Sequence, residues 1–131
     1  IGLLRALGAR VTLCGPAMMC PPGLAALGCE VSNDLDALVP EADVLMMLRI
    51  QFERGGGARL ASQRLYHACY GLTLGRAQRM KAGAIVMHPG PMNREVEIAG
   101  EVADSGRSVI RDQVAGGVLV RKAALMTAMG R

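Results

Sequence analysis

The stretch Asp43-Val-Leu-Met-Met-Leu48 decides the fold class of this chain, and a second apolar run follows at Ala84-Ile-Val-Met87. Both runs are short and continuous. A strand that carries apolar side chains on both faces is typical of a parallel sheet covered by helices on each side. The two runs therefore predict an α/β domain built on a doubly wound parallel sheet, which is a Rossmann-like architecture.

The rest of the chain alternates short apolar runs with helical segments, as parallel α/β domains do. Ser32-Asn33-Asp34 can cap a helix after the second strand. A helix that opens on Pro21-Pro22 suits proline, which tolerates the first helical turn. Further strands are expected at 10–14, 29–31 and 108–110, and helices at 21–28 and 112–129.

One strand is missing from this pattern. A doubly wound domain normally opens with its central strand, but the helical segment at Ile1 has no strand before it. We therefore expect the chain to begin inside a larger protein. We also expect its sheet to lack the strand that belongs between two strands it contains.

Length and composition allow one soluble domain. The chain has 131 residues, of which 51% are hydrophobic and 20% charged. No apolar run reaches the roughly 18 residues of a membrane span. A net charge of +4 and 2% aromatic residues give no nucleic-acid platform. Four cysteines without C-x-x-C spacing suggest free thiols in a cytoplasmic protein, with neither a metal nor an organic cofactor.

Two irregular segments, 52–62 and 88–100, follow the two strong strand candidates. Ligands of open α/β sheets bind at the carboxyl ends of the strands. The first segment contains Gly55-Gly-Gly57 and is expected to be a mobile loop. The sequence thus places a ligand site at this edge before any chemistry is assigned.

Arg49 and Gln51 lie at the end of the first strong strand candidate. A guanidinium group offers a planar fork that binds a carboxylate through two hydrogen bonds. Gln51 points roughly the same way if the strand continues, and it adds an amide. Two interpretations fit this segment alone: a carboxylate site, or an arginine that extends from the sheet edge into water beside a solvated glutamine.

The loop His88-Pro89-Gly90-Pro91 is more specific. Two prolines remove N–H donors and leave free carbonyl groups, while Gly90 permits close backbone approach to a ligand. Such a loop suits a ligand that donates hydrogen bonds, such as a carbamoyl NH2 group, and an ordinary turn is the alternative. The Gly90-Pro91 bond can also be cis.

His88 and Arg94 are expected to support this loop rather than to react. A histidine at a strand end usually hydrogen-bonds a neighbouring loop, although its pKa also suits an acid or base. Arg94 can form ion pairs with Glu95 and Glu97.

Four segments together resemble a known family. They are Leu48-Arg-Ile-Gln-Phe-Glu-Arg54, Tyr70-Gly-Leu-Thr73, Met87-His-Pro-Gly-Pro-Met-Asn-Arg94 and Gln113-Val-x-x-Gly-Val118. In this order and spacing they resemble the C-terminal, aspartate-binding domain of the aspartate carbamoyltransferases, over essentially all of residues 1–131. The His-Cys-Leu-Pro and Ser-Met-Gly motifs of the related ornithine enzymes do not occur here.

The resemblance implies a function and its residues. Arg49 and Gln51 would bind L-aspartate, Pro89, Gly90 and Pro91 would bind the carbamoyl side of carbamoyl phosphate, and 52–66 would close over both. The phosphate-binding Ser-Thr-Arg-Thr motif and the catalytic residues would lie in the carbamoyl-phosphate-binding domain, which is absent from these 131 residues. The family implies a homotrimer, with a regulatory chain or a dihydroorotase as possible further partners.

Three departures from the family pattern concern loop closure. Gly55-Gly-Gly57 replaces an expected methionine, Leu65 replaces a usual glutamate, and Gly116 replaces an asparagine. Three other hypotheses stay open. They are a paralogous carbamoyltransferase for another amine, a catalytically silent fragment, and a nucleotide-binding module, which would need a G-x-G-x-x-G motif that the sequence lacks.

Overall fold

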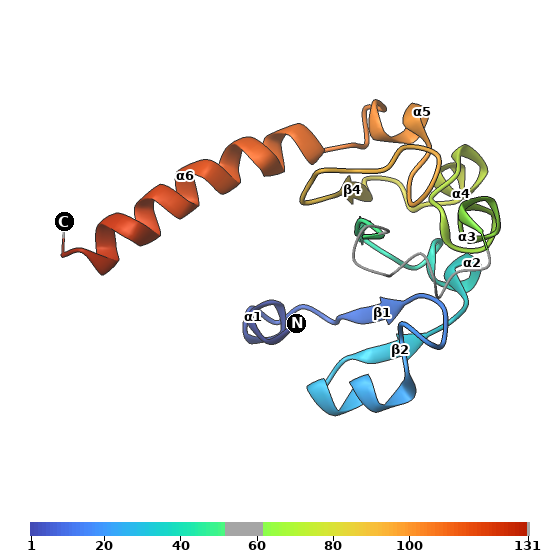
Figure 1. The fold of residues 1–131 in the computed structure, drawn as a ribbon, viewed down its shortest axis with the longest axis horizontal. Helices are drawn as coiled ribbons and strands as arrows, with labels where there is room; N and C mark the ends of the chain where they lie inside the picture. The colour runs from blue at the N-terminus through green and yellow to red at the C-terminus, as the bar shows by residue number, and fades with distance from the viewer. Residues whose placement is uncertain (52–61, 131) are drawn as a thin grey trace.

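The computed structural model describes residues 1–51 and 62–130 and has an α/β architecture (Figure 1). The first half contains α1 (Gly2–Ala6), β1 (Thr12–Cys14), the 3-10 helix η1 (Pro22–Leu27), β2 (Glu30–Ser32), α2 (Leu35–Leu38) and β3 (Val44–Met46). The second half contains α3 (Gln63–Tyr70), α4 (Leu74–Gln78), β4 (Ile85–Met87), α5 (Gly100–Ala103) and α6 (Ile110–Ala128).

The strands form two separate parallel pairs. In one pair Leu13 of β1 lies opposite Val31 of β2, and in the other Leu45 of β3 lies opposite Val86 of β4. No described strand joins the two pairs. Across Figure 1 the order is β2, β1, β3 and β4, so the interruption falls between β1 and β3. This is the place at which a doubly wound sheet of this connectivity has its first strand.

The hydrophobic core lies around the second pair. Leu45 is 9% exposed and Val86 fully buried, and they pack with the fully buried Leu72 and Ile98. The apolar run at 43–48 predicts that both faces of β3 are covered, and this prediction is wrong for the described residues. Val44, Met46 and Leu48 are between 43% and 59% exposed because no described element packs on their face.

The predicted strand at 108–110 is reduced to a single bridge between Ser108 and Val86. The backbone N–H of Val109 donates to the carbonyl of Val86, and helix α6 then begins at Ile110. One bridged residue is too little for a strand because the chain turns at once into the helix. The helix therefore starts two residues before the predicted position.

Side-chain caps define three helix starts. Asp34 accepts a hydrogen bond from the Ala37 N–H at 3.0 Å, which confirms the predicted cap of α2. Ser62 and Thr73 cap α3 and α4 in the same way. These two helices were not expected from the apolar pattern, since both are short and lie beside a glycine.

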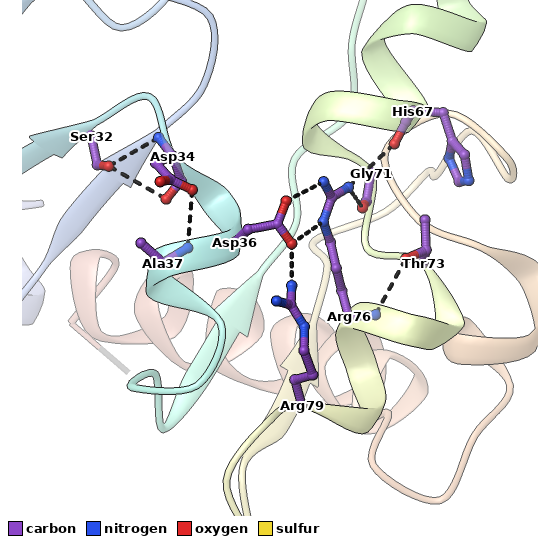
Figure 2. A network of polar contacts seen from close by, with 9 residues as sticks. All are labelled: Ser32, Asp34, Asp36, Ala37, His67, Gly71, Thr73, Arg76 and Arg79. Carbon is purple, nitrogen blue, oxygen red and sulfur yellow. Dashed lines mark hydrogen bonds and ion pairs between the residues drawn. The ribbon is translucent and has the colours of Figure 1, made fainter.

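A buried arginine joins α2 to α4 (Figure 2). Arg76 is 8% exposed, and its Nε and Nη2 donate to the two carboxylate oxygens of Asp36 at 3.1 and 2.7 Å. Its Nη1 donates to the carbonyl of Gly71 at 2.8 Å, and Arg79 also reaches Asp36. The hydrogen bond from Arg76 lowers the pKa of Asp36 to about 2. The network holds the helices around the core in one arrangement.

The Tyr70-Gly-Leu-Thr73 segment has a structural explanation. A Cβ atom at Gly71 would lie 2.5 Å from Nδ1 of His67 and 2.9 Å from the Val96 carbonyl, so only glycine fits. Leu72 is fully buried and hydrogen-bonds to the backbone of Glu97. The segment therefore fixes the loop after β4 against the core.

Helix α6 projects away from the rest of the molecule (Figure 1). Its predicted apolar side is exposed, with Val114, Val118, Leu125 and Met129 between 47% and 63% accessible. Among the described residues, no helix is long and apolar enough to cross a membrane.

Candidate functional site

The candidate site is set by the parallel pairing of β3 and β4. Met46 lies opposite Met87, and the N–H of Met47 donates to the Met87 carbonyl at 2.9 Å. Because the two strands run in the same direction, the segments after them leave the sheet at the same edge. The segment with Arg49 and Gln51 and the loop that starts at His88 therefore begin side by side.

His88 lies fully buried at the base of the loop. Its Nδ1 accepts a hydrogen bond from the Gly90 N–H at 2.9 Å, so in the neutral ring Nε2 carries the proton. Nε2 lies 3.2 Å from Oε1 of Glu97 and donates to it. The His88 N–H donates to Oε1 of Gln113 at 2.9 Å, which ties the loop to α6. With both ring nitrogens engaged, the imidazole holds the loop.

The Pro-Gly-Pro segment turns over this histidine. The Gly90-Pro91 peptide bond is cis and Gly90 has φ 65°, a conformation that favours glycine. Pro89 and Pro91 are exposed. Neither proline has an N–H group, so these two residues can offer a ligand carbonyl acceptors and apolar rings but no backbone donor. This surface can receive a group that donates hydrogen bonds.

Asn93 connects the loop to the other segment. Its Nδ2 donates to the carbonyl of Ile50 at 3.0 Å, and its backbone N–H donates to Oε1 of Glu97 at 2.5 Å. Ile50 is buried and stands between Arg49, which is half-buried, and Gln51, which is exposed. The residues predicted to contact the two substrates thus belong to segments that touch each other.

Neither Asn93 nor Glu97 was predicted as a site residue. The sequence offers Asn93 only as one residue of the Met87–Arg94 motif, and it predicts a surface ion pair for Glu97. A signal for Glu97 existed, because it is a lone carboxylate within the apolar run Val96-Glu-Ile-Ala99. A charged residue in such a run is buried only where it has partners. For Asn93 no such signal exists in the sequence.

The prediction that Arg94 forms ion pairs with Glu95 and Glu97 is wrong, because its partner in the structure is Asp104. Arg94 makes a two-pronged contact with Asp104, at 2.6 and 2.9 Å. The turn at 95–98 lets the long arginine side chain reach α5, while Glu97 turns inward. The Asp104 carboxylate raises the pKa of Arg94 and has its own pKa lowered. The exposed pair lies on the outer side of the loop.

The expected closing segment 52–66 is only partly described. Residues 52–61, with the Gly55–Gly57 departure, lie outside the described residues. The remainder caps and begins α3, where Leu65 is 53% exposed. Gly116 lies in α6. Within 1–51 and 62–130, no three His, Cys, Asp or Glu side chains are grouped as metal ligands.

Comparison with known proteins decides the family. Residues 2–128 match the model of the aspartate/ornithine carbamoyltransferase Asp/Orn-binding domain. The chain belongs to this family. It is 57% identical over 122 residues to an aspartate carbamoyltransferase catalytic subunit of Myxococcus xanthus (strain DK1622), with 93% of this chain and 41% of the relative covered. The counterpart of Syntrophotalea carbinolica is 54% identical over 127 residues, covering 97% and 41%.

Solved structures of the family share the fold. The ornithine carbamoyltransferase of Thermus thermophilus superposes with a TM-score of 0.77 at 16% identity, covering 96% of this chain and 42% of that one. Aspartate transcarbamoylase of Trypanosoma cruzi in complex with aspartate and phosphate gives 0.63 at 26% identity, covering 88% and 37%. The chain thus spans about 40% of the length of the family members it matches.

Proposed function

We propose that this chain is the aspartate-binding part of an aspartate carbamoyltransferase, whose phosphate-binding domain is supplied by a longer gene product. The observation that carries the proposal is the junction of the Arg49–Gln51 segment with the His88 loop through Asn93 and Ile50. One segment offers a guanidinium group for a carboxylate, and the other offers carbonyl groups for a carbamoyl NH2. A two-substrate reaction needs these features next to each other.

In the proposed reaction, the amine of L-aspartate attacks the carbamoyl carbon of carbamoyl phosphate. A C–N bond forms, the C–O bond to phosphate breaks, and the amine loses a proton. The products are N-carbamoyl-L-aspartate and phosphate, at an early step of pyrimidine synthesis. Arg49 and Gln51 bind aspartate, and Pro89, Gly90 and Pro91 orient the carbamoyl group. The likeness to catalytic subunits named for aspartate supports this substrate over ornithine.

The wider assembly belongs to the same proposal. We expect a cytoplasmic homotrimer in which α6 packs on the phosphate-binding domain, since its apolar side is exposed in this chain. A regulatory chain or a dihydroorotase can join such a trimer. No metal or organic cofactor enters the proposed chemistry.

The test compares amines and one arginine variant in the full-length gene product. We expect carbamoylation of aspartate but not of ornithine. Arg49→Leu should raise the KM for aspartate at least about tenfold, because it removes a charge-assisted carboxylate contact. The 131 residues alone should give no product, since the phosphate-binding motif is not among them. Transfer to ornithine, or turnover by the 131 residues alone, would contradict the proposal. A full-length product that carbamoylates neither amine would contradict it as well.

A further inference from the structure

Three residues, Asn93, Glu97 and His88, form a continuous hydrogen-bonded path between the two parts of the candidate site. The path starts at the Ile50 carbonyl, which accepts from Asn93, and passes to Glu97 through the Asn93 N–H. From Oε1 of Glu97 it continues to Nε2 of His88, and it ends where Nδ1 of His88 accepts the Gly90 N–H. One end is a backbone group of Ile50, between Arg49 and Gln51, and the other is a backbone group of Gly90, which is itself proposed to contact substrate.

The centre of this path is rigidly placed. Glu97 is fully buried, and its backbone carbonyl accepts a hydrogen bond from the N–H of Leu72 in the core. Its Oε1 accepts from both Asn93 and His88. Among the described residues, Oε2 is buried without a hydrogen-bond partner. A carboxylate is rarely buried so completely unless it is paired, and here both hydrogen bonds to Oε1 come from the loop that holds Pro89, Gly90 and Pro91.

We propose that Asn93 and Glu97 are positioning residues, which set the spacing between the Arg49–Gln51 segment and the Pro89–Pro91 loop. The inference rests on the proposed function, because that spacing aligns the aspartate amine with the carbamoyl carbon. Neither residue touches substrate. A small displacement of one segment relative to the other would leave each substrate bound but misaligned, and a misplacement of about 1 Å can lower a rate on the order of 100-fold.

The same atoms predict which substitutions preserve the path. Glu97→Gln keeps an acceptor at Oε1 and changes only Oε2, whereas Glu97→Leu removes the acceptor. Asn93→Asp has the same shape but replaces the donor that faces the Ile50 carbonyl with an acceptor. Asn93 is only half-buried, so this variant should fold even if Glu97→Leu does not.

Matched controls are available elsewhere in the chain. Asn33 also donates through Nδ2 to a backbone carbonyl, that of Gly15, at 2.6 Å, but between β1 and β2. Glu95 accepts a backbone N–H from Gly100 at 2.7 Å on the surface. Asn33→Asp and Glu95→Leu therefore remove the same kinds of contact outside the path.

The experiment measures kcat and KM for aspartate, together with Tm, in the full-length gene product. We expect Asn93→Asp and Glu97→Leu to lower kcat about 10- to 100-fold with KM changed less than about threefold. Glu97→Gln and both control variants should stay within about twofold of the parent protein. The inference is overturned if Asn93→Asp keeps its kcat, or if Glu97→Gln loses as much as Glu97→Leu.

A second measurement separates this inference from the proposed function. In amide NMR spectra of the same protein, Asn93→Asp should shift the signals of Gln51 and Gly90, while Asn33→Asp should shift neither. This holds whichever amine the enzyme uses. If the spectra behave so but aspartate is not carbamoylated, the proposed function fails and the coupling of the two segments stands. If Gln51 and Gly90 do not respond, the coupling fails whatever the activity.

Discussion

The two parallel strand pairs are alike in design and different in packing. Each consists of two three-residue strands in direct register. The β3–β4 pair places Leu45 and Val86 in the core, whereas the side chains of β1 are all half-buried and Glu30 of β2 is exposed. Backbone pairing is therefore the same in both, and the burial of side chains is what differs.

The strand pair with the more deeply buried side chains is also the pair that carries the candidate site. Both segments of the candidate site leave from the β3–β4 pair, and Glu97 anchors the loop at His88 to the same core. The β1–β2 pair contributes Cys14 at the edge of that core. Catalytic geometry needs a rigid scaffold, so the well-packed pair can define its half of the site.

The largest expected effect is a loss of stability when the middle residue of a strand is truncated, and it is compared between the two pairs. Leu45→Ala should lower the free energy of unfolding by about 2–5 kcal/mol, because it opens a cavity in the core. Leu13→Ala, at the equivalent position of β1, should lower it by less than half as much, since that side chain is only half-buried. Urea unfolding followed by circular dichroism measures both. Equal losses would show that the two pairs are packed alike.

The parallel α/β class and most strand positions could be predicted because short apolar runs that alternate with helical segments are typical of parallel α/β domains. The position of the candidate site, at the carboxyl ends of the strands, is predicted from the same pattern. The exposure of Val44 and Met46 could not be predicted, because an apolar run such as 43–48 does not indicate which segment packs on each face of the strand. Helices α3 and α4 escaped prediction since Ser62, Gly71 and Thr73 define them through caps and close contacts, not through periodicity.

The site residues divide in a similar way. Arg49, Gln51 and the Pro-Gly-Pro loop have functional groups that suggest a ligand by themselves. Asn93 acts through a contact with Ile50, 43 positions away along the chain. Arg94 forms an ion pair with Asp104, and not with its neighbours in sequence, because the intervening backbone folds back on itself. Contacts between distant segments depend on how the loop is folded, and composition does not record that.

A smaller effect on the free energy of unfolding is expected from arginines that join two elements. The comparison here is between a buried arginine and an exposed one. Arg76→Met should lower the free energy of unfolding by about 1.5–3 kcal/mol, because buried charge-assisted hydrogen bonds to Asp36 and Gly71 are lost. Arg5 also links two elements, donating to the Leu27 carbonyl at 3.2 Å, but it is exposed. Arg5→Met should give no resolvable change in the same urea titration. A similar loss from both would mean that burial does not distinguish the regions.

The smallest effect concerns acid. The hydrogen bond from Arg76 lowers the pKa of Asp36 from 3.8 to about 2, so the folded chain holds this proton less tightly than the unfolded chain. The stabilisation is therefore complete above about pH 4 and is lost as the pH falls toward 2. Because the Asp36 side chain is half exposed, water screens the pair and the effect on stability stays modest. Asp36→Asn should flatten the fall in Tm between pH 4 and 2 while lowering Tm at pH 7. If Tm falls equally between pH 4 and 2 in the parent protein and in the variant, Asp36 does not cause that fall. The contact between α2 and α4 would then depend on hydrogen bonds that do not need the charge of Asp36.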